Sequence, residues 1–189
     1  MAYLDKIVTG INEIIKGKLS AFPTAVYFGI TYPITSTAGK IQNVMPAFID
    51  ISGLVNEITF NDIPSLTIYH KISSSTYSQI KNASYGNENS GFQHTIDLDL
   101  IVMGDRKKVR VQPESLEVAI ASNIPSSIKI ESANYVNIFP TNANHNSRQL
   151  FSQEYAGAAF FLKPEYIYFS IRYRVEIRYQ KGCFSLCQC

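Results

Sequence analysis

Residues 168–179, YFSIRYRVEIRY, alternate apolar and polar side chains without interruption. Because successive side chains of a β-strand point to opposite sides of the sheet, this pattern predicts a long strand, from about Glu165 to Tyr179, with one buried and one polar face. The polar face carries Ser170, Arg172, Arg174, Glu176 and Arg178. The rest of the chain must therefore supply a core for the apolar face, and the arginine-rich face needs an explanation of its own.

A second stretch, FQHTIDLDLIVMG at residues 92–104, has acidic residues where the first has arginines. Asp97 and Asp99 are two residues apart, which places both carboxylates on one side of a strand. If this strand is the antiparallel neighbour of 165–179, opposite charges across the two strands contribute about 0.2–1 kcal/mol per pair. We favour this pairing over a metal site built from the two carboxylates. The same polar face is the candidate subunit interface, formed by Asp97, Asp99, Arg172, Arg174, Glu176 and Arg178.

Nucleic-acid binding is the alternative explanation for the arginine row. The aromatic rings of the final strand lie on the opposite face from the arginines, so the two cannot form one stacking surface. Glu176 interrupts the row, and 17 basic against 15 acidic residues leave a net charge of only +2. The other basic cluster, RKKVR at 106–110, is expected to be a solvated turn. We therefore do not expect direct DNA binding.

The remaining elements predict an α+β fold in one domain over residues 1–182. Apolar residues in LDKIVTGINEII, residues 4–15, recur at helical spacing and predict an amphipathic amino-terminal helix. Proline followed by two acids predicts a second helix over Pro113–Ser122, and a short third one is expected over Gln149–Tyr155. Short β-rich stretches separated by turn residues predict a mainly antiparallel sheet on which these helices pack.

Polar segments predict three loops, over residues 33–44, 73–91 and 140–150. Long polar loops of this kind are often functional or become ordered on a partner. The last seven residues, 183–189, form a separate tail that holds all three cysteines, Cys183, Cys187 and Cys189. Their C-x3-C-x-C spacing matches no standard zinc pattern, so we expect a reduced tail without metal.

Motifs of catalysis and cofactor binding are absent from the sequence. It contains no GxxxxGK, GxGxxG, GxSxG or HExxH. His70, His94 and His145 are far apart in the chain, and each is expected to be a packing or surface residue. No apolar run reaches the length of a membrane span, and charged residues interrupt the amino-terminal helix. We expect a protein made in the cytoplasm, with no enzyme activity, no cofactor and no membrane partner.

The order of these elements resembles that of the small ring-forming proteins of tailed-bacteriophage necks and tails, the tail-terminator and head-tail connector families. The resemblance lies in LDKIVTGINEII, in HTIDLDLIVMG followed by the helix PESLEVAIASNI, and in FSIRYRVEIRY. It implies a structural virion subunit that forms a homo-oligomeric ring around the DNA channel and joins neighbouring neck or tail proteins. The longer loops at 73–91 and 140–150 depart from the simplest members and leave the position of the ring open.

Two other classes remain open from the residues alone. One is a non-viral binding or assembly module, such as a surface or secretion-apparatus subunit. The other is an enzyme whose dispersed histidines converge on an acidic residue in space.

Overall fold

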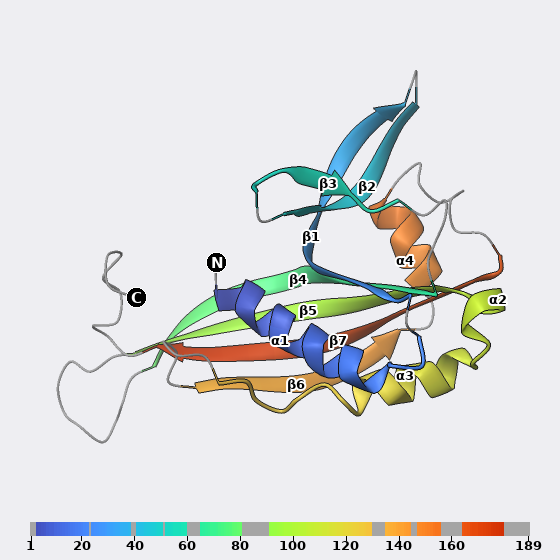
Figure 1. The fold of residues 1–189 in the computed structure, drawn as a ribbon. Coiled ribbons are helices and arrows are strands. Elements are labelled where there is room, and N and C mark those ends of the chain that lie inside the picture. The colour runs from blue at the N-terminus through green and yellow to red at the C-terminus, as the bar shows by residue number, and fades with distance from the viewer. Residues whose placement is uncertain are drawn as a thin grey trace, which may run out of the picture.

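The computed structural model describes residues 3–22, 24–38, 41–50, 52–59, 65–80, 91–129, 135–144, 147–155 and 164–179. The fold is α+β, as expected: a seven-stranded, mostly antiparallel sheet with helices packed against it (Figure 1). In chain order the elements are α1 (Tyr3–Lys18), β1 (Val26–Ala38), β2 (Ile41–Ile49), β3 (Val55–Glu57), β4 (Leu66–Ile80), β5 (Gly91–Asp105), α2 (Arg106–Val109), α3 (Pro113–Ala121), β6 (Tyr135–Asn144), α4 (Ser147–Glu154) and β7 (Tyr166–Tyr179).

The strand order is β3-β2-β1-β4-β5-β7-β6, and only the β1–β4 pair is parallel. The two strands with complementary charges, β5 and β7, are antiparallel neighbours at the centre of the longest part of the sheet. Their register runs without a shift from Phe92 opposite Tyr179 to Asp105 opposite Tyr166. The predicted adjacency of these strands is therefore confirmed.

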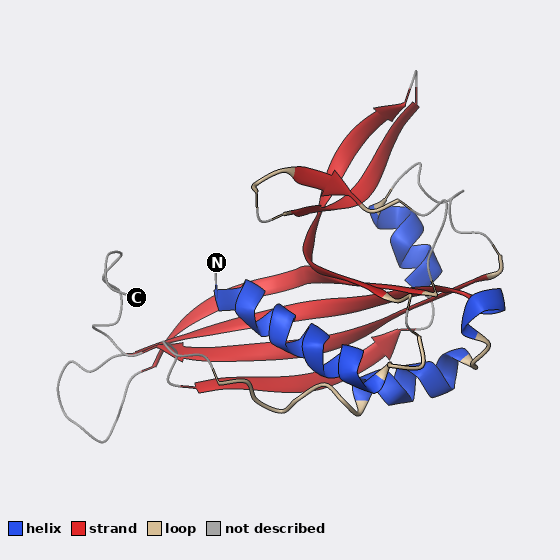
Figure 2. Ribbon diagram, in the orientation of Figure 1, coloured by secondary structure: helices blue, strands red, loops and turns tan. Residues whose placement is uncertain are grey.

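Helices α1 and α3 cover one face of the sheet (Figure 2). The apolar stripe of α1, which includes Ile7, Val8, Ile11 and Ile15, is fully buried, so the predicted amphipathic helix is confirmed. It packs against the even-numbered apolar residues of β5 and the odd-numbered ones of β7. Burying each such side chain contributes about 1.5–3 kcal/mol, which makes this face the main core.

The opposite face has a smaller core at one end of the sheet. Helix α4 places Phe151 on Tyr168, with ring centroids 5.1 Å apart, and Tyr69, Ile101 and Met103 complete the cluster. The rest of this face is polar. The division explains why β7 alternates so regularly: its odd positions serve the main core, and its even positions serve the smaller core at Tyr166 and Tyr168 and the polar face from Ser170 onward.

Two of the expected loops are largely β-structure. Within 33–44, β1 continues to Ala38 and β2 begins at Ile41, and the two form a hairpin paired from Tyr32–Ala47 to Ala38–Ile41. Within 73–91, residues 73–80 extend β4 and Gly91 begins β5, whereas 81–90 lie outside the described residues. The predictions were wrong because Ser, Asn, Gly and Pro are common in turns, and backbone pairing with a neighbouring strand overrides that preference.

The third expected loop, 140–150, also contains regular structure. Strand β6 continues to Asn144 and α4 begins at Ser147, with residues 145–146 outside the described part. Strand β6 begins at Tyr135, and residues 130–134 before it lie outside the described residues. The basic turn at 106–110 is the short helix α2, whose amino terminus is capped by Asp105 and whose Val109 is buried.

Gly104 lies where β5 approaches the start of β4 too closely for a side chain. A Cβ atom there would lie 2.8 Å from Leu66 Cδ2 and 3.0 Å from the Ser65 carbonyl oxygen. We expect Gly104→Ala to lower the free energy of unfolding by about 1–3 kcal/mol, because the buried neighbours must shift. Urea denaturation followed by circular dichroism measures the change.

Gly17→Ala is the matched control, because a Cβ atom at Gly17 meets nothing within 4 Å. In helix α1 alanine is the better helix former, so this variant should be neutral or more stable by up to about 1 kcal/mol. Equal stabilities for the two variants would contradict the close-packing argument at Gly104.

Candidate functional site

The candidate site is the polar face of β4, β5, β7 and β6, on the side of the sheet opposite α1 and α3. Asp97 lies directly opposite Arg174, and Asp99 directly opposite Arg172. Arg174 donates from Nε to Asp97 Oδ1 at 2.8 Å and from a terminal nitrogen to Oδ2 at 3.2 Å. The structure thus brings together four of the six residues that the sequence predicts for this surface.

Arg172 and Asp99 form the more buried of the two pairs. Arg172 donates from Nε to Asp99 Oδ1 at 2.7 Å and from a terminal nitrogen to Oδ2 at 3.1 Å. The Asp99 side chain is 12% exposed and that of Arg172 is 48% exposed. The hydrogen bond to Asp99 raises the pKa of Arg172, and the one from Arg174 lowers the pKa of Asp97. Both pairs are bidentate, a geometry that restrains the guanidinium groups.

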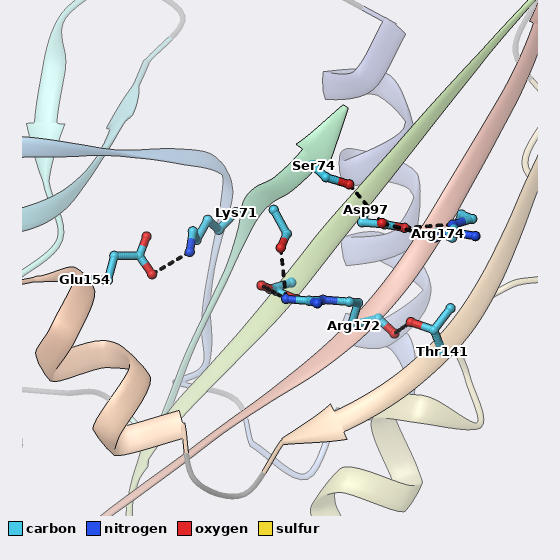
Figure 3. Close-up of polar contacts among 9 residues, drawn as sticks. Lys71, Ser74, Asp97, Thr141, Glu154, Arg172 and Arg174 are labelled. Carbon is cyan, nitrogen blue, oxygen red and sulfur yellow. Dashed lines mark hydrogen bonds and ion pairs between the residues drawn. The ribbon is translucent and has the colours of Figure 1, made fainter. Parts of the chain in front are cut away.

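Neighbouring strands extend both ion pairs across the face (Figure 3). On β4, Ser74 donates to Asp97 at 2.9 Å, and Ser73 accepts from Arg172 at 2.9 Å. On β6, Thr141 donates to the backbone carbonyl of Arg172 at 3.2 Å. Side chains of β4 and β5 thus surround both ion pairs, and β6 contacts the backbone of β7 beside them.

The other two predicted residues do not join these pairs. Glu176 lies opposite Thr95, and Arg178 donates from Nε to Gln93 at 3.3 Å. On the face and on the adjoining α4, five cations lie beside four carboxylates: Lys71, Arg148, Arg172, Arg174, Arg178 and Asp97, Asp99, Glu154, Glu176. The surface is therefore mixed in charge and has little basic excess to attract phosphates.

A cleft of about 380 Å³ lies between this face and α4. Lys71 from β4 and Glu154 from α4 form an ion pair in its wall, beside Ser73 and Ser170. The sequence did not predict this pair, because the position of α4 over the sheet has no local signal. Each described cation in the lining, Lys71 and Arg172, is already paired with a carboxylate.

His70 lies inside the protein, fully buried between the sheet and α1. Asn12 Nδ2 donates to the Phe28 carbonyl at 2.9 Å, which orients the Asn12 amide so that its Oδ1 faces His70 Nε2 at 2.8 Å. Nε2 must therefore carry the proton, and Nδ1 accepts from the Tyr173 hydroxyl at 2.8 Å. Every polar atom of the ring thus has a partner.

Burial lowers the pKa of His70 to about 3 and raises the pKa of Tyr173 far above its ordinary value. The imidazole is therefore neutral at physiological pH, and its two ring nitrogens face an amide and a phenol rather than a carboxylate. This arrangement makes His70 a hydrogen-bonded part of the core. The apolar residues of LTIYH, 66–70, could have indicated its burial, but nothing near it in sequence indicates Asn12 or Tyr173 as partners.

The two described histidines, His70 and His94, have different hydrogen-bond partners and do not share a site. His94 lies on β5, where its Nε2 is 2.7 Å from Ser75 Oγ and its ring stacks on Tyr77 with centroids 4.0 Å apart. His145 and the three cysteines lie outside the described residues. Within the described ranges, no three His, Cys, Asp or Glu side chains are grouped so that they could hold a metal ion.

In the part of the chain that the structure describes, no helix has the length and apolarity to span a membrane. No protein-family model matches the sequence, and no curated protein matches it.

Proposed function

We propose that this chain is a structural, non-enzymatic virion subunit of a tailed bacteriophage, which assembles into a ring in the neck or tail and joins neighbouring rings around the DNA channel. The observation that carries the proposal is an arm formed by residues 32–38, β2 and β3. This arm leaves the main sheet beyond Thr31 and projects from it (Figure 1). The resemblance in element order supplies the phage neck or tail as the setting.

The arm exposes apolar side chains to water, and a contact with another subunit would bury them. Tyr32, Ile49, Val55 and Leu54 are 46%, 57%, 58% and 65% exposed. Between the base of the arm and α1 lies a groove of about 710 Å³, lined by Ile30, Tyr32, Phe48 and Ile49 among others. Exposed apolar groups gathered on a projecting element are typical of protein contacts.

In a ring of identical subunits, each subunit needs two different and complementary surfaces, because it contacts one neighbour with the first and the other neighbour with the second. The arm supplies the first, and the remaining body of the subunit supplies the second. The polar face supports the same proposal indirectly, because two of its three arginines, Arg172 and Arg174, are paired with aspartates and are not directed toward a nucleic acid. The ring would then surround the DNA without binding it directly.

Light scattering and negative-stain electron microscopy of the purified chain test the ring. We expect a closed oligomer, and we expect the protein to sediment with virion fractions. Leu54→Lys should weaken assembly, because a charge in the centre of the apolar contact must be desolvated. Val118→Lys is the matched control, since Val118 on α3 is also 65% exposed.

A chain that stays monomeric at every concentration and never occurs in particles would overturn the proposal. Equal assembly of the two lysine variants would instead remove the arm from the contact.

A further inference from the structure

The outer edge of β4 is half covered. Strand β1 pairs with β4 from Val26–Thr67 to Thr31–Lys71 and then turns away into the arm. Beyond this point β4 continues from Ile72 to Ile80, paired with β5 on its inner side. No strand among the described residues lies on its outer side. Nine residues of strand therefore present backbone donors and acceptors along an open edge.

The far edge of the same group of strands is protected. On β6, the Ile138 amide donates to the Ser126 carbonyl at 2.9 Å, and Asn137 forms an isolated bridge with Ser127. Two residues further along, Pro140 has no amide proton to donate. Such devices prevent strand addition at β6. The open part of β4 has a register shift between Ile72 and Ser74, at its start, and pairs with β5 without a further shift from Ser74 to Ile80.

The sequence of the open edge favours pairing. Residues 72–80, ISSSTYSQI, contain neither a charge nor a proline, which are the usual means of blocking an edge strand. Tyr77 is 70% exposed and lies flat on His94, so it adds an aromatic surface beside the edge. An edge of this length and composition is suited to receive another strand.

We propose that the occupant is the same edge of a second copy of this chain, paired antiparallel about a two-fold axis. Close to the axis of such a contact each residue faces its own symmetry mate, so a charge there would face a like charge. Residues 72–80 carry none.

In this arrangement the strands β4-β5-β7-β6 of the two copies form one continuous sheet. With the axis perpendicular to the sheet, the two polar faces lie on the same side and α1 of both copies on the other. The bend of β1 at Thr31 in each copy limits the paired length to the open residues. This contact does not depend on the arm, so it does not require the proposed ring.

Thr76→Lys tests the contact, because Thr76 is exposed near the centre of the edge and a lysine there would face its own copy. By light scattering, we expect wild-type particles to contain an even number of 21.2 kDa chains and the variant particles to have half that mass. Val118→Lys adds the same charge far from the edge and should leave the mass unchanged. Amide hydrogen exchange provides a second measurement: protection along 72–80 should fall in Thr76→Lys and remain in Val118→Lys.

A wild-type chain that is monomeric at high concentration, with outward amides of 72–80 that exchange freely, would overturn the contact. An oligomer whose mass is the same in Thr76→Lys and wild type would also overturn it, since its copies would meet elsewhere. Leu54→Lys separates this contact from the proposed ring. If Leu54→Lys abolishes rings and leaves dimers, the β4 contact forms without the arm. If Thr76→Lys leaves rings of half the wild-type mass, both contacts exist.

Discussion

Replacing His70 with leucine should lower the free energy of unfolding at pH 7 by about 2–6 kcal/mol. The substitution leaves two buried polar groups, Asn12 Oδ1 and the Tyr173 hydroxyl, without their hydrogen-bond partner. Each unsatisfied buried group costs about 1–3 kcal/mol. Urea denaturation monitored by circular dichroism measures the loss.

The same variant should change how stability depends on pH. The pKa of His70 is about 3 in the folded protein against 6.5 for an ordinary histidine, so between these values the unfolded chain binds one proton more. Stability from His70 is therefore complete above pH 6.5 and is lost as the pH falls toward 3. From pH 7 to pH 5 the wild type should lose about 2 kcal/mol that His70→Leu does not lose, at about 1.4 kcal/mol per pH unit.

Tyr173→Phe is the control for the pH effect. It removes one hydrogen bond to His70 but keeps the buried imidazole, so it should be less stable at all pH values and retain the acid slope of the wild type. His94, whose pKa is also lowered by burial, is present in all three proteins and cancels in the comparison. A constant stability gap between His70→Leu and wild type from pH 7 to pH 5 would contradict the neutral, buried assignment.

The second large effect is expected at Arg172. Arg172→Met should destabilise the fold by about 1–3 kcal/mol, because it leaves the nearly buried carboxylate of Asp99 without its bidentate donor. The lower end of this range applies if solvent screens the half-exposed guanidinium. A double-mutant cycle with Asp99→Asn should show that the double variant loses less than the sum of the single ones.

The pair Asp97–Arg174 provides the comparison. It has the same bidentate geometry, but it is more exposed, so its coupling in the equivalent cycle should be smaller. Equal coupling free energies for both pairs would show that the burial of Asp99 does not strengthen its ion pair with Arg172. Additive losses at Asp99 and Arg172 would show that their contact contributes nothing to stability.

The elements with strong periodicity were predictable. The alternation in β5 and β7 and the apolar stripe of α1 each arise from the repeat of a regular backbone, so they can be read without knowing what packs on them. The pairing of Asp97 and Asp99 with Arg174 and Arg172 followed from opposite charges on two strands of matching pattern. Arg178 and Glu176 have the same pattern but no acid or base opposite them.

Other features could not be predicted, because distant segments create them. Residues 73–80 are strand only because β5 lies beside them, and 33–44 form a hairpin because β1 and β2 pair. His70 is a buried hydrogen-bonded residue because Asn12, 58 positions away, and Tyr173, 103 positions away, meet it in the core. None of these contacts can be inferred from the residues that lie nearby in the sequence.

By itself, the sequence determined the α+β class, the long central strands with their buried and polar faces, and the complementary charges between β5 and β7, since side-chain periodicity and charge are local properties. Only the tertiary structure decided where β1 leaves β4, and with it the arm and the open edge at 72–80, because a strand's edge is free or covered according to what lies beside it in space. YFSIRYRVEIRY is thus a strand in which Arg172 and Arg174 are held by aspartates of the neighbouring strand β5, and the surfaces that we propose for partners lie elsewhere, on the arm and on β4.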